Sequence, residues 1–123
     1  MYIHKYHKAL IEVASKLFLY FLKDDYASKF RRMLTIEQYR SNKALKMFKK
    51  YFIEDVLFYQ STLFECLIQT DNFNKFDSHI MALHFYSPIF MLLLQYDNQE
   101  EKESEALDIL AKHVKQFSLL YIK

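Results

Sequence analysis

The chain of 123 residues suits a single domain, and its complete lack of glycine excludes the glycine-rich phosphate loops of P-loop enzymes and dinucleotide-binding folds. Its one cysteine, Cys66, excludes an internal disulfide and a thiolate zinc cluster, and we expect that side chain to be buried. The net charge of +2 divides into 12 Lys and Arg against 4 Asp and Glu in residues 1–50, and 5 against 11 in residues 51–123. A solvated basic surface explains this division better than a nucleic-acid interface.

The first helix is predicted from near the N-terminus to about Lys23, because apolar residues recur along it at steps of three and four. The repeat consists of Tyr2, Tyr6, Leu10, Val13, Leu17 and Tyr20. It reaches the first residues without a capping side chain or an acidic first turn. We therefore expect that Met1 lies inside a longer helix that has been cut.

Two further helices are predicted before residue 71. Asp24 and Asp25 supply a cap for a second helix that ends near Arg40. Asn42 can cap a third, which ends near Thr70. The predicted inward stripe of the third helix consists of Leu45, Phe48, Phe52, Val56, Tyr59, Leu63 and Leu67.

The fourth helix is predicted over residues 78–96, capped by Asp77 or Ser78, and the fifth over residues 104–121. Pro88 lies inside the fourth helix, where proline removes one hydrogen bond and clashes with the preceding turn. We favour one kinked helix, because the apolar pattern continues through it. The alternative is a new helix that starts at Ser87 and Pro88. The predicted architecture is one all-α domain, residues 1–123, built as a five-helix bundle.

The fourth helix is apolar on two sides. Ile80, Leu83, Ser87, Met91 and Leu94 share one side, and Met81, Phe85, Ile89, Leu92 and Tyr96 share another. A helix that is apolar nearly all round must be covered on both sides, and a short chain has little material for this. We therefore predict a homodimer, with an interface of Met81, Phe85, Ile89, Leu92, Tyr96, Leu107, Leu110, Val114, Phe117 and Tyr121.

Metal and catalytic sites find little support in the sequence. His4 and His7 have no carboxylate at ligand spacing, and no Glu-x-x-His motif is present, so no metal site is predicted. No Ser/His/acid or Cys/His set can be proposed from spacing, so we predict neither an enzyme nor a cofactor. The apolar runs are too short to span a membrane and no signal peptide is visible, so we expect a cytoplasmic protein.

A nucleic-acid site is also weakly supported. The basic residues of the second and third helices lack the short reading helix that a helix-turn-helix requires, so we interpret them as a solvated face. They are Arg31, Arg32, Arg40, Lys43, Lys46, Lys49 and Lys50.

A pocket for a small apolar or aromatic molecule is the best functional candidate, because 18% of the residues are aromatic. Such pockets combine apolar walls with a few polar groups. The predicted lining consists of Phe18, Met33, Phe52, Tyr59, Gln60, Leu63, His84 and Ser87. For Tyr59 and His84 we favour ordinary core packing, and a contact with the ligand is the alternative.

Four segments together resemble the C-terminal domain of TetR/AcrR-type transcriptional regulators, in particular those of low-GC Gram-positive bacteria. They are FRRMLTIEQYR (Phe30–Arg40), YFIEDVLFYQSTLFECLI (Tyr51–Ile68), MALHFYSPIF (Met81–Phe90) and HVKQFSLLY (His113–Tyr121). The similarity extends in order over about residues 5–121. None of the segments is a mechanistic signature, because this domain is the variable half of such regulators.

The resemblance implies a ligand-sensing and dimerisation domain of a transcriptional repressor. In such proteins an N-terminal helix-turn-helix domain, missing from this chain, binds operator DNA. The last two helices dimerise as an intersubunit four-helix bundle, and they match His79–Tyr96 and Ser104–Tyr121 here. A small hydrophobic or aromatic effector would alter operator binding by a population shift. The alternative is a freestanding helical interaction and dimerisation module without ligand sensing.

Overall fold

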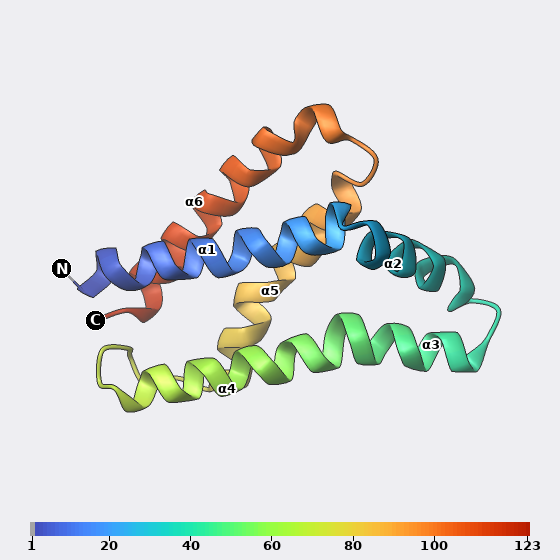
Figure 1. The fold of residues 1–123 in the computed structure, drawn as a ribbon. Helices are drawn as coiled ribbons and strands as arrows, with labels where there is room; N and C mark the ends of the chain where they lie inside the picture. The colour runs from blue at the N-terminus through green and yellow to red at the C-terminus, as the bar shows by residue number, and fades with distance from the viewer. Residues whose placement is uncertain (1) are drawn as a thin grey trace.

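A computed structural model describes residues 2–123, with side chains from Lys5 onward, and the regular elements of this part are all helices. The predicted five-helix, all-α bundle is confirmed (Figure 1). The elements are α1 (Tyr2–Lys23), α2 (Asp25–Glu37), a long third helix made of α3 (Asn42–Lys49), the π-helical η1 (Lys50–Glu54) and α4 (Asp55–Gln69), then α5 (Ser78–Gln95), the 3-10 turn η2 (Glu100–Lys102) and α6 (Glu103–Tyr121). The expectation of a cut helix concerns Met1, which lies outside the described residues, as does the side chain of His4.

The helix α5 is central to the bundle. It crosses behind α1 and α4 in Figure 1 and packs most extensively on α4, while α6 lies against α1. Both α1 and α4 contact α5, but they make few direct contacts with each other. These two helices are therefore held beside one another largely through the elements they share.

Side-chain caps set the starts of three helices. Asp24 caps α2 and Asp77 caps α5, each accepting two backbone hydrogen bonds, as predicted. The long third helix is capped by the Ser41 hydroxyl, so the predicted Asn42 cap is wrong by one residue. The helix α5 continues through Pro88, which confirms the interpretation of one helix over two.

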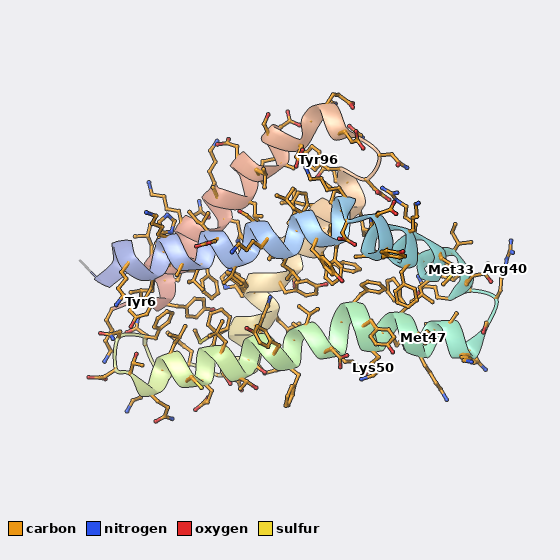
Figure 2. All side chains as sticks on the ribbon, viewed as in Figure 1. Tyr6, Met33, Arg40, Met47, Lys50 and Tyr96 are labelled. Carbon is orange, nitrogen blue, oxygen red and sulfur yellow. The ribbon has the colours of Figure 1, made fainter. Side chains whose placement is uncertain are left out.

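The two ends of the described chain meet at the loop between α4 and α5. Phe73 forms an isolated antiparallel bridge with Ile122, and the Asn72 amide donates to the Tyr6 hydroxyl at 3.1 Å. Tyr6, labelled in Figure 2, also packs edge-on against Phe73, with ring centroids 5.2 Å apart. Asp71 opens the loop with a φ of 65°, a left-handed conformation that Asp tolerates better than most residues. These contacts, which we name the Tyr6 junction, fasten the beginning of α1 to the loop and the C-terminus.

The π-helical turn shifts the register of the third helix. Before it, Phe48 and Phe52 are buried as predicted. After it, the buried residues are Leu57, Gln60, Phe64 and Ile68, each one position beyond the predicted Val56, Tyr59, Leu63 and Leu67. A π turn closes its hydrogen bonds over five residues instead of four, so everything after it is rotated. The predicted stripe is therefore wrong beyond residue 54, and Cys66, expected to be buried, is exposed.

A buried arginine fastens α2 to α1 and to the loop after α5. Arg31, expected on a solvated face, is only 4% exposed. Its Nε donates to the Phe21 carbonyl and its Nη2 to Asp97 Oδ1, both at 3.0 Å, while Arg32 Nη2 donates to the same oxygen at 2.7 Å. Burial acts to raise the pKa of Asp97, but the hydrogen bonds and charges of the two arginines outweigh it and hold that pKa below its ordinary value.

Candidate ligand groove and exposed helical face

The structure buries the side of α5 that was expected at the dimer interface. Phe85 is 1% exposed and contacts Phe64 of α4 and Phe117 of α6, with ring centroids 5.5 and 5.2 Å apart. Eight of the ten predicted interface residues are buried within this one chain: Met81, Phe85, Ile89, Leu92, Tyr96, Leu110, Val114 and Phe117. Leu107 and Tyr121 are partly buried against the same core. The predicted choice of face is corrected, because these residues form the core of a single subunit.

The opposite side of α5 is exposed and carries no charge. Met91 is 66% exposed, and Ile80 and Leu94 are both more than half exposed, with Leu83 less so. They recur at helical spacing along α5, which has no Asp, Glu, Lys or Arg from Ser78 to Gln95. Solvated helix faces carry charged side chains, whereas the centres of interfaces are depleted in them. This side therefore has the composition of an interface.

An adjoining strip of α6 extends the uncharged surface. His113 Nε2 donates to the Phe85 carbonyl at 3.0 Å, and the side of α6 that His113 shares also holds Ile109, Gln116 and Leu120. Ile109 and Leu120 are exposed. We name the exposed apolar residues of both helices the α5–α6 face: Ile80, Leu83, Met91, Leu94, Ile109 and Leu120.

The position of His113 beside this face predicts sensitivity to acid. Burial lowers the pKa of His113, the Phe85 carbonyl opposes this, and His84 lowers it further, for a net decrease from 6.5. The unfolded chain therefore binds a proton at higher pH than the folded chain does. The stability that the neutral His113 contributes should be fully present above pH 6.5, the ordinary pKa of histidine. It should decline as the pH falls below 6.5 toward the lower pKa of the folded chain. Urea unfolding at pH 7.5 and 5.5 measures the decline, which His113→Gln should reduce and the exposed-site control His79→Gln should not.

A groove of about 500 Å³ lies between α1 and α4. It is lined by Val13, Lys16, Leu17 and Tyr20 of α1 and by Asp55, Val56, Tyr59 and Gln60 of α4. Its two charged residues pair with neighbours along the chain, Lys16 with Glu12 at 3.1 Å and Asp55 with Lys50 at 3.3 Å. Apart from Gln60, the remaining walls are aliphatic and aromatic. The groove therefore suits a largely apolar small molecule.

The eight predicted pocket residues are divided among several places. Tyr59 and Gln60 line the groove. Phe18 and Phe52 are buried in the core, and Leu63 is half-buried on α4. Met33 projects from α2, far along the molecule from Tyr6 (Figure 2), and His84 and Ser87 are exposed on α5. The eight residues therefore do not form one pocket, and the groove lies between the first and third helices.

Gln60 is the polar side chain that distinguishes this groove. It is 2% exposed, and its Oε1 is the one buried side-chain nitrogen or oxygen without a hydrogen-bond partner among the described residues. Its polarity alone placed it in the predicted pocket. Its burial in place of Tyr59 follows from the π turn, for which the local sequence gave no signal.

The described side chains contain no group of three His, Cys, Asp or Glu placed to hold a metal ion. Within residues 2–123, no helix combines the length and apolar character needed to cross a bilayer. No protein-family model matches the sequence, and no curated protein or solved structure shows significant similarity to it.

Proposed function

We propose that this chain is the effector-binding and dimerisation domain of a TetR-like transcriptional repressor that acts as a cytoplasmic homodimer. The observation that carries the proposal is α5, a helix of 18 residues without a charged side chain. One side of it fills the subunit core, and the other leaves Met91 and its neighbours uncovered. The resemblance to TetR/AcrR regulators assigns dimerisation to the last two helices, and these same helices carry the α5–α6 face.

A second copy of the chain is the partner that suits this face. A two-fold interface places one patch against an identical patch, so any net charge on the patch would repel its own copy. This surface avoids such repulsion, because α5 has no Asp, Glu, Lys or Arg and the adjoining side of α6 holds Ile109, His113, Gln116 and Leu120. Pairing α5 and α6 with their equivalents would produce a bundle of four helices between the subunits.

The groove between α1 and α4 is the proposed effector site. Because these helices make few direct contacts, a molecule inserted between them changes their separation without breaking a large interface. The Tyr6 junction holds the beginning of α1, and Arg31 holds the Phe21 carbonyl near its end. In a TetR-like arrangement the operator-binding domain would precede α1. A ligand that prefers the wider separation would then alter the spacing of two such domains in the dimer.

A thermal-shift screen with hydrophobic and aromatic compounds tests the effector site. At a hundredfold excess over its Kd, a ligand that binds only the folded chain stabilises it by about 2.7 kcal/mol. For a domain of this size that raises the Tm by roughly 10 °C. Leu17→Trp should fill the groove and abolish the shift. The control Leu19→Trp alters a partly buried leucine of the same helix outside the groove and should preserve it.

The screen also separates the two functional hypotheses. Compounds that stabilise the parent chain and lose their effect in Leu17→Trp support the sensor. A dimeric chain that no compound stabilises would instead match a dimerisation module without ligand sensing.

A further inference from the structure

One of the residues that line the groove has an unsatisfied hydrogen-bond acceptor. Gln60 lines the groove on its α4 side, and its Oε1 is buried without a donor. A buried polar atom without a partner costs free energy that a suitable donor would recover. Because the charged lining residues, Lys16 and Asp55, already have partners, Gln60 is the group with an unmet requirement.

The fold holds Gln60 in this position through the π turn. The turn rotates α4 by one residue, which turns Gln60 inward and leaves Tyr59 67% exposed. The hydroxyl of Tyr86 on α5 donates to the carbonyl of Phe52 within the turn, and so joins the turn to the central helix. The orientation of Gln60 is therefore supported by a tertiary contact.

The aromatic residues that line the groove favour a ligand with a flat ring. Tyr20 from α1 and Tyr59 from α4 line it, and both are more than half exposed. Aromatic rings contact flat apolar molecules favourably. Val13, Leu17 and Val56 complete the apolar lining.

We propose that the groove takes a mostly apolar, ring-containing molecule with one hydroxyl group, and that this hydroxyl donates a hydrogen bond to Gln60 Oε1. The inference rests on the proposed function, since it names the chemical class of that effector. It also supplies the differential affinity that a sensor needs. Oε1 is closed to solvent, so a ligand hydroxyl that binds it requires the walls of the groove to move. If α1 and α4 separate to admit it, the new hydrogen bond favours the separated arrangement.

The test compares 4-pentylphenol with 4-pentylanisole, which has the same ring and chain but no hydroxyl donor. Their Kd values are measured by calorimetry on the full 123-residue chain. The phenol should bind about tenfold more tightly, a difference equivalent to about 1.4 kcal/mol. Gln60→Leu removes the acceptor at similar size and should abolish the preference while retaining the affinity for the anisole. Gln60→Met should do the same, and so provides a second variant if the first folds poorly.

Gln69→Leu is the matched control, because Gln69 is an exposed glutamine on the same helix outside the groove. It should keep the tenfold preference. Equal affinities for the two probes in the parent chain, or a preference that persists in both Gln60 variants, would overturn the inference and leave the groove as an apolar effector site. Failure of both probes to bind would overturn the effector site itself, and the inference with it.

Discussion

Met91→Arg is expected to convert the proposed homodimer into folded monomers. Met91 is 66% exposed in the single chain and is the most exposed apolar residue of the stripe on α5. In a two-fold interface the substitution would bury one unpaired charge from each subunit, at a cost of several kcal/mol. Since each factor of ten in Kd corresponds to about 1.4 kcal/mol, the dimer should weaken at least about a hundredfold. Sedimentation velocity over a concentration series measures this.

Met33→Arg is the matched control for that experiment. Met33 is 48% exposed on α2, outside the α5–α6 face, so the same change of side chain should leave the dimer intact (Figure 2). Both variants should retain the helical circular dichroism of the parent, because both side chains are largely outside the core. A parent chain that stays monomeric at high concentration, or a Met91→Arg chain that dimerises like the parent, would contradict the proposed interface.

The apolar pattern of α5 predicted two covered sides but not which side belongs to which partner. Both sides recur at helical spacing, so the periodicity is the same for each. The core side is decided by Phe64 on α4 and Phe117 on α6, which surround Phe85 in the folded chain. These contacts join residues far apart in sequence, and local pattern does not contain them. The predicted interface consequently fell on the core side.

The groove shows a second limit of local pattern. The apolar spacing of the third helix, if it continues past residue 54 as an uninterrupted α-helix, places Tyr59 inward and Gln60 beside it. The π turn reverses the two, and one of its contacts comes from Tyr86, 34 residues after Phe52. Helix number, the Asp24 and Asp77 caps and the passage through Pro88 were predictable, because each depends on residues within a few positions.

Arg31→Ala is expected to destabilise the single subunit, with a loss of about 3 kcal/mol in the free energy of unfolding. This effect should be larger than that of the neighbouring variant Arg32→Ala. Arg31 is 4% exposed, and its guanidinium joins the Phe21 carbonyl of α1 to Asp97 after α5. Its removal leaves a space beneath α2, deprives the Phe21 carbonyl of this donor and takes one of two arginines from Asp97. Equilibrium urea unfolding near pH 7 measures the change.

Arg32→Ala separates this role from the simple loss of a positive charge. Arg32 binds the same carboxylate, yet its side chain is 36% exposed, so water can replace much of what is removed. Its loss should cost less than about 1 kcal/mol, as for other solvent-exposed ion pairs. Equal destabilisation of the two variants would mean that the lost stability comes from removing a positive charge beside Asp97, and not from the buried position of Arg31. If neither variant were destabilised, the contact between α2 and the loop after α5 would not limit the stability of the bundle. In that case the position of α1 in the effector mechanism would depend on the Tyr6 junction.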